Sequence, residues 1–126
     1  MSKHQKETDI RFMRRALQLA KRGYGKVSPN PMVGAVLVSH HEIIGEGWHR
    51  KAGGPHAEVI AIREAEKKGN TTHLSTLYVS LEPCSTTGRT PPCTDAIMQS
   101  SIQRVVIACE DPNPAHAGKG IKILED

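Results

Sequence analysis

Two cysteines and a short His-Ala-Glu stretch are the residues of this chain whose types and spacing could do chemistry. Cys84 and Cys93 lie in EPCSTTGRTPPC (82–93), and His56 and Glu58 flank Ala57 in the sequence. Thiolate sulfur and imidazole nitrogen are ligands that suit zinc, and three protein ligands leave a fourth position for water. A carboxylate beside such a water could take its proton and return it to a leaving group. The pattern therefore favours a catalytic zinc site.

Cys84 and Cys93 could instead form a disulfide or be two small core residues. The chain has three cysteines, and its N-terminal residues MSKHQKETDIRF lack the apolar segment of a secretory signal. We therefore expect a cytoplasmic location, where clustered cysteines are more often metal ligands or catalytic groups than disulfides. Cys109, in an apolar stretch, is interpreted as a core residue.

Helices and strands alternate along the chain in a way that predicts one α/β domain over residues 1–126 with a mixed sheet. The later strands are expected to be parallel neighbours. Asp9 is expected to cap the first helix, in which Ile10, Met13, Leu17 and Ala20 recur at helical spacing. The predicted helices cover 9–22, 57–68 and a short piece starting at Thr90; the predicted strands cover 33–38, 42–48, 76–81 and 104–109.

This order brings the chemical residues to one edge of the sheet. Cys84 follows the carboxyl end of strand 76–81, whereas His56 and Cys93 stand at two helix starts. Ligand sites in open α/β sheets form at the carboxyl ends of strands, and helix N-termini stabilise thiolates.

Composition limits the class of partner. The net charge is +4, which mildly favours an anionic partner, but four aromatic residues are too few for a platform that stacks single-stranded nucleic acid. The chain has no run of 18 apolar residues, so we expect no membrane span. A phosphorylated small molecule suits this charge as well as a nucleic acid does.

The order of HAE, PC and a second cysteine resembles the cytidine-deaminase superfamily, whose pattern is H-x-E followed by P-C-x-x-C. Here the second cysteine comes after eight intervening residues. The longer PCSTTGRTPPC, together with SPNPMVGAV, GEGWHRKAGGPHAE and DPNPAHAGKGI, resembles the pyrimidine deaminase family of riboflavin biosynthesis. This likeness runs from about residue 10 to the end of the sequence.

The resemblance implies a three-layer α/β/α fold in which four strands are visible and a fifth is absent from the sequence. It also implies a reaction: hydrolysis of the 2-amino group of 2,5-diamino-6-(5-phosphoribosylamino)pyrimidin-4-one, giving 5-amino-6-(5-phosphoribosylamino)uracil and ammonia. By position, zinc would be bound by His56, Cys84 and Cys93, and Glu58 would move protons. The implied substrate contacts are Asn30, His49, Arg89, Asp111 and Asn113.

The family implies further partners. Its members are often fused to an NADPH-dependent reductase, so NADP is expected only if such a domain follows outside this chain. We also expect a homo-oligomer and no nucleic-acid partner. Two alternatives stay open: a deaminase of another base, such as tRNA adenosine, cytidine or guanine, and a zinc-stabilised binding module without catalysis.

Overall fold

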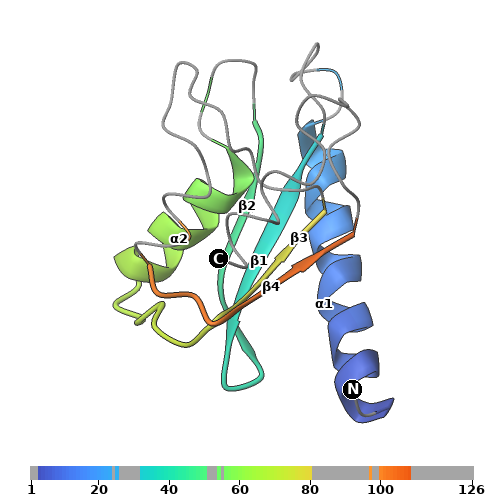
Figure 1. Cartoon of the computed structure of the whole chain (residues 1–126). Coiled ribbons are helices and arrows are strands. Elements are labelled where there is room, and N and C mark those ends of the chain that lie inside the picture. The colour runs from blue at the N-terminus through green and yellow to red at the C-terminus, as the bar shows by residue number, and fades with distance from the viewer. Residues whose placement is uncertain are drawn as a thin grey trace, which may run out of the picture.

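The computed structural model describes residues 3–23, 25, 32–50, 54, 56–80, 97 and 100–108. These residues form two long helices, a short 3-10 helix and four strands (Figure 1). Their bounds are α1 Lys3–Ala20, η1 Lys21–Gly23, β1 Gly34–Ser39, β2 Glu42–Trp48, α2 Ala57–Lys67, β3 Thr76–Val79 and β4 Arg104–Ile107.

The four strands form one mixed sheet in the order β2-β1-β3-β4. β1 is antiparallel to both β2 and β3, and β3 is parallel to β4. The predicted parallel pairing of the later strands is therefore confirmed for β3 and β4, whereas β2 and β3 run in the same direction with β1 between them. As a result, the end of β2, the start of β1 and the ends of β3 and β4 share one edge of the sheet.

A two-residue turn joins β1 to β2. His40 and His41 both have positive φ, 52° and 65°, and Ser39 pairs with Glu42. Two consecutive residues in this left-handed region give a turn whose twist matches that of the flanking strands. β1 and β2 therefore form a hairpin, within which lie the two strands predicted from the sequence.

Side chains of the strands alternate between two helices, one on each face of the sheet (Figure 1). Val36, Val38 and Tyr78 pack against α1 with Phe12, Ala16 and Leu19. The residues facing α2 are Ala35, Leu37, Leu77 and Val79. This period of two is what a strand covered on both faces requires. The expected three-layer α/β/α fold is confirmed.

The start of α1 differs from the prediction, because the helix begins at Lys3 and Asp9 does not cap it. Asp9 is 8% exposed and lies inside the helix. Its Oδ1 accepts a hydrogen bond from the Tyr78 hydroxyl at 2.6 Å, and Arg104 donates to Oδ1 and Oδ2 at 2.8 and 2.6 Å. The carboxylate therefore joins α1 to β3 and β4, which sequence spacing alone could not show.

The buried face of α1 contains part of the predicted apolar stripe: Ala20 is buried and Met13 packs against the core, but Ile10 and Leu17 do not belong to it. Phe12, Ala16 and Leu19 are buried, whereas Ile10 and Leu17 are 45% and 44% exposed. The buried set also contains Asp9, whose charge is neutralised by Arg104. Because Asp9 is polar, the sequence of α1 does not show its buried face as a continuous apolar repeat.

The close packing of the helices depends on strand glycines. A Cβ added at Gly47 would lie 2.4 Å from the carbonyl oxygen of Ala57, and one added at Gly45 would lie 2.2 Å from that of Ala61. Glycine at both positions therefore allows the α2 backbone to lie directly on β2.

The predicted short third helix lies mostly outside the described residues, and residues 109–126, with Cys109, lie wholly outside them. Ile97 is the described exception: it is helical, 2% exposed and part of the core that includes α2. Within the described ranges, no helix is long and apolar enough to span a membrane.

Candidate active site

His56 and Glu58 stand at the start of α2, at the sheet edge where β2 ends. His56 is the N-cap residue, with extended φ and ψ of −78° and 159°, and its carbonyl oxygen accepts the Ile60 N–H at 3.1 Å. Its side chain makes no capping hydrogen bond to the helix. The imidazole of His56 therefore belongs to a residue that lies just outside the regular spiral, which is how an i,i+2 pair can converge.

Glu58 is buried in the first turn of α2, with 3% of its surface exposed. The N-terminus of a helix stabilises a carboxylate through its free N–H groups and its dipole. Glu58 follows Ala57, whose backbone lies directly on β2 at Gly47, and its side chain is enclosed by protein rather than exposed on the surface. A buried carboxylate in this position can exchange protons with a bound molecule while bulk water is excluded.

His49, predicted to contact substrate, is brought next to His56. Its backbone N–H donates to the Val33 carbonyl at 3.0 Å, which extends the β1–β2 pairing by one residue. The side chain is buried, and its ring centroid lies 5.4 Å from that of His56, with the two planes nearly perpendicular at 87°. Two imidazoles and one carboxylate thus gather where β2 ends and α2 begins.

The remaining predicted site residues lie outside the described residues, so their predicted roles stay predictions. They are Asn30, Cys84, Arg89, Cys93, Asp111 and Asn113. Among the residues that the structure describes, no group of three or more His, Cys, Asp or Glu side chains could hold a metal ion. The proposed ligand set needs both cysteines, so this finding does not test it.

Ser80 is a residue of this edge that sequence reasoning missed. It follows β3 directly, its backbone N–H donates to the Gly34 carbonyl and its hydroxyl accepts the Gly34 N–H, both at 3.0 Å. Ser80 thereby fixes the point at which the chain leaves β3 on its way to Cys84. In the sequence, the only sign of this role is that a hydroxyl residue directly follows the apolar stretch TLYV.

Trp48, with Arg22 and Arg50, forms a second unpredicted feature of the same edge. The guanidinium carbon atoms of Arg22 and Arg50 lie 4.9 and 4.5 Å from the centroid of the Trp48 ring. Trp48 ends β2 and directly precedes His49. The ring of Trp48 packs on the α1 face of the sheet, whereas His49 contacts His56 at the start of α2, on the other face.

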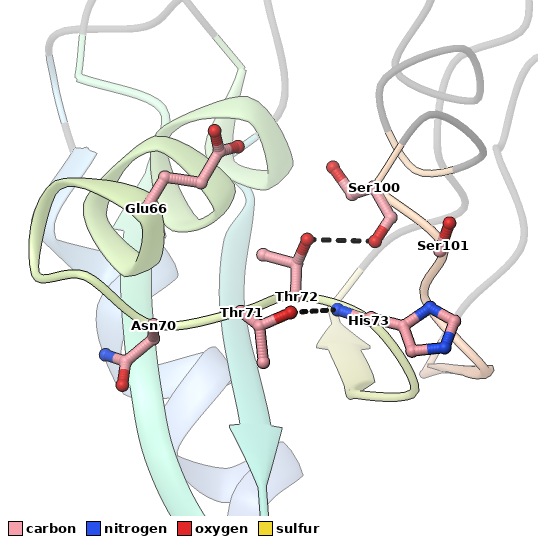
Figure 2. Close-up of a pocket in the computed structure, with 7 residues that line it drawn as sticks. All are labelled: Glu66, Asn70, Thr71, Thr72, His73, Ser100 and Ser101. Carbon is pink, nitrogen blue, oxygen red and sulfur yellow. Dashed lines mark hydrogen bonds between the residues drawn. The ribbon is translucent and has the colours of Figure 1, made fainter.

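A separate hollow of about 430 Å³ lies toward the opposite edge of the sheet, beyond the end of α2 (Figure 2). It is lined by Glu66, Asn70, Thr71, Thr72, His73, Ser100 and Ser101. The Thr72 hydroxyl donates to the Ser100 carbonyl at 2.8 Å, and the Thr71 hydroxyl accepts the His73 N–H at 3.3 Å. These bonds hold the segments that lead into β3 and β4, so the hollow is explained by local structure.

Two ionic groups away from the candidate site have shifted pKa values. Burial, and then the hydrogen bond to Asp9, raise the pKa of Tyr78 to about 12. The paired Arg15 lowers the pKa of Glu46 through two hydrogen bonds of 2.6 and 3.1 Å. Both groups join α1 to the sheet, so they stabilise the helix whose end lies at the active edge.

Comparison with known proteins agrees with this geometry. Residues 6–109 match the family model described as the cytidine and deoxycytidylate deaminase zinc-binding region. The chain belongs to this deaminase family. Family membership confirms the predicted resemblance and the predicted enzyme class, a hydrolytic deaminase, and supports zinc as the metal of the family.

Named relatives narrow the resemblance within the family. The riboflavin biosynthesis protein RibD of Aquifex aeolicus is 53% identical over 96% of this chain and 33% of its own length. The diaminohydroxyphosphoribosylamino-pyrimidine deaminase of Buchnera aphidicola is 50% identical over 90% of this chain and 75% of its own length. The crystal structure of the deaminase/reductase of Thermotoga maritima matches with a TM-score of 0.90 and 51% identity, over 94% of this chain and 34% of that one.

This chain spans different fractions of the lengths of its relatives. The chain spans about a third of the length of RibD from Aquifex aeolicus, but three quarters of the Buchnera aphidicola deaminase. The region that this chain shares with both relatives is therefore the deaminase region.

Proposed function

We propose that this chain hydrolyses the 2-amino group of 2,5-diamino-6-(5-phosphoribosylamino)pyrimidin-4-one to give 5-amino-6-(5-phosphoribosylamino)uracil and ammonia. The single observation that carries the proposal is the placement of His56 and buried Glu58 at the start of α2, beside His49, in a chain of the deaminase family. The relatives named for RibD and for the pyrimidine deaminase support the choice of substrate.

The proposed metal is zinc, held by His56, Cys84 and Cys93. Two thiolates and one imidazole are a donor set typical of zinc sites that keep a position open. The position of His56 as the N-cap residue of α2, beside buried Glu58, supports its part in this set. When bound, zinc supplies Lewis acidity that makes water acidic enough to react at neutral pH.

Glu58 is the proposed proton carrier. Its carboxylate would accept a proton from the attacking water and deliver it to a ring nitrogen of the pyrimidine. A second transfer through the same carboxylate would protonate the departing amino group, so that ammonia leaves. Burial of Glu58 favours this role because few bulk water molecules compete for the proton.

Asn30, His49, Arg89, Asp111 and Asn113 are the proposed substrate contacts. His49 is the described member of this set, and its buried ring beside His56 is consistent with a position at the wall of the substrate site. The cytoplasmic location, the homo-oligomer and the absence of a nucleic-acid partner also remain predictions.

The substitution Glu58→Gln tests the proposal. The amide keeps the size of the side chain but cannot accept a proton, so ammonia release should fall at least about 100-fold while bound zinc is retained. Glu64→Gln is the matched control, because Glu64 lies on the same helix, where it pairs with exposed Lys68 at 3.0 Å, and its loss should leave the rate unchanged.

A rate unaffected by Glu58→Gln would contradict the assigned role of Glu58. A wild-type chain that binds zinc but releases no ammonia from this substrate would favour a binding module or a deaminase of another base.

A further inference from the structure

Ser80 ends the pairing between β1 and β3 in an irregular way. Ala35 pairs with Val79 in this antiparallel ladder, so Gly34 and Ser80 are the next two residues to face each other. In a regular ladder such a pair exchanges two backbone hydrogen bonds, in which each N–H donates to the carbonyl of the other residue. The first bond is present, from the Ser80 N–H to the Gly34 carbonyl at 3.0 Å. In place of the second, the Gly34 N–H donates at 3.0 Å to the side-chain hydroxyl of Ser80.

The hydroxyl of Ser80 therefore takes the place of a backbone carbonyl in the ladder. β3 ends at Val79, and the chain can turn away from the sheet at Ser80 because the Gly34 N–H already has its acceptor. Without the hydroxyl, two responses are possible. Either the ladder continues for one more residue through the carbonyl of residue 80, or the Gly34 N–H loses its partner.

The hydroxyl is difficult to replace by water, because its bond to Gly34 is buried. The backbone of α1 covers Gly34 closely, since a Cβ added there would clash with the carbonyl oxygen of Ala16 and the nitrogen of Ala20. Ser80 itself is buried. A buried N–H without an acceptor is strongly unfavourable, so loss of the hydroxyl favours a longer ladder and a different exit of the chain from β3.

Backbone bonds at the same edge of the sheet connect Ser80 to the histidine pair. Val33, the residue before Gly34, accepts the His49 N–H at 3.0 Å, and the ring centroid of His49 lies 5.4 Å from that of His56. These backbone bonds join neighbouring strands within the sheet, so the connection does not depend on which face a side chain occupies. The point at which the chain leaves β3 is thereby fixed relative to His56.

We propose that Ser80 is a positioning residue for the metal ligand Cys84, and that it acts through the bond from Gly34 to its hydroxyl. Cys84 comes four residues after Ser80, so the direction of the chain at Ser80 sets which positions the thiolate can reach. This inference rests on the proposed function for the identity of the metal ligands. Loss of a group that orients a metal ligand typically lowers metal affinity about 10- to 100-fold.

The zinc affinity of the 126-residue chain tests this role. Ser80→Ala removes the hydroxyl, and its dissociation constant for zinc, measured by competition with a chromophoric chelator, should rise about 10- to 100-fold. Co²⁺ bound in place of zinc gives visible absorption bands that depend on the arrangement of its ligands, and these bands should shift in Ser80→Ala. Ser80→Thr keeps a hydroxyl, so its zinc affinity and its Co²⁺ bands should match those of the wild type.

Ser75→Ala is the matched control variant. Ser75 directly precedes β3, is buried, and donates its hydroxyl to the Thr72 carbonyl at 2.6 Å. Loss of this bond should lower the free energy of unfolding but leave the dissociation constant for zinc within about twofold of the wild type, because the bond lies at the other end of the strand.

Ser80→Thr and Ser80→Val form a second pair, in which the two side chains have nearly the same shape and differ in the hydroxyl. Ser80→Val should bind zinc as weakly as Ser80→Ala. This comparison holds even if Ser80→Ala fails to fold.

Equal zinc affinities and equal Co²⁺ bands in Ser80→Val and Ser80→Thr would overturn the inference, even if the wild-type chain releases ammonia. A loss of zinc affinity that is equally large in Ser75→Ala would also overturn it, because the effect would then follow general stability. Zinc affinity that depends on the Ser80 hydroxyl, in a chain that releases no ammonia from the phosphoribosylated pyrimidine, would instead overturn the proposed function and leave the role of Ser80 standing.

Discussion

Gly47→Ala should impair catalysis more than its effect on stability explains. An alanine Cβ at this position would lie 2.4 Å from the Ala57 carbonyl oxygen and 2.8 Å from the Ala61 nitrogen. Both are backbone atoms of α2, so no side chain can rotate away. To reach an ordinary contact of 3.4 Å, the first turn of α2 must move away from β2 by about the difference, 1 Å.

This displacement acts directly on the two residues that the helix start carries, His56 and Glu58. A misplacement of about 1 Å at a catalytic group can lower a rate by roughly 100-fold. Overpacking of a closely packed layer costs about 1–3 kcal/mol of folding free energy. The variant should therefore stay folded at 25 °C while kcat/KM for ammonia release falls about 100-fold.

The assay compares kcat/KM with the free energy of unfolding measured in denaturant for the same preparations. Leu77→Ala is the control, because Leu77 lies in the same core and its truncation costs about 2–5 kcal/mol by removing atoms, with no atom added against α2. It should lose more stability but less activity than Gly47→Ala. If activity followed stability in both variants, the close approach of α2 to Gly47 would have no special role in placing Glu58.

Three further predictions concern the ionic groups that join α1 to the sheet. Asp9→Ala should lower the free energy of unfolding in denaturant by about 3 kcal/mol, because it leaves Arg104 and the buried Tyr78 hydroxyl without their shared acceptor; a loss below about 1 kcal/mol would refute this. The absorbance difference at alkaline pH between the wild type and Tyr78→Phe should show that Tyr78 titrates near pH 12. Because folding raises the pKa of Tyr78, the free energy of unfolding should decrease as pH rises from about 10 toward 12. Titration of Tyr78 near pH 10 would contradict the prediction. Since the folded pKa of Glu46 is lowered, its pair with Arg15 should contribute roughly 0.5–1 kcal/mol near pH 7 and lose this as pH falls through that lowered pKa; an acid-unfolding curve unchanged by Glu46→Gln would argue against it.

The strands and α2 could be predicted from the sequence because each carries a strong local signal. The apolar stretches GAVLV and TLYV have side chains buried on both faces of the sheet, and the turn at His40 and His41 separates β1 from β2. α2 has an alanine-rich inner face at helical spacing, with Ala57, Ala61 and Ala65 all fully buried. Local patterns were sufficient wherever the buried residues are apolar.

α1 shows where local reasoning fails. Asp9 was interpreted as a cap because an acidic residue before an apolar repeat usually starts a helix. Its actual partners, Tyr78 and Arg104, are distant in sequence, so the ion pair that buries it becomes visible only in the fold. Asp9 shares the buried face with Phe12, Ala16 and Leu19, whereas Ile10 and Leu17 are exposed.

The candidate site was predictable to the extent that it depends on residue type and order. The placement of His56 and Glu58 at the start of α2 agrees with the expectation from the order of elements, whereas His49 was predicted as a substrate contact from the resemblance alone. The arginine pair on Trp48 carries no local signal, because Arg22 belongs to a basic helix end that sequence alone presents as a solvated surface. The contact of Arg22 with Trp48 depends on α1 ending on the start of β1, where Gly34 pairs with Trp48.

The deamination is tested most directly by measuring the ammonia that the zinc-loaded 126-residue chain releases from 2,5-diamino-6-(5-phosphoribosylamino)pyrimidin-4-one. Cytidine and a tRNA adenosine substrate are assayed in parallel. We predict one ammonia for each phosphoribosylated pyrimidine consumed, and none from the other two substrates. Ammonia from cytidine or tRNA adenosine but not from the phosphoribosylated pyrimidine, in a folded chain that retains its zinc, would contradict the assignment.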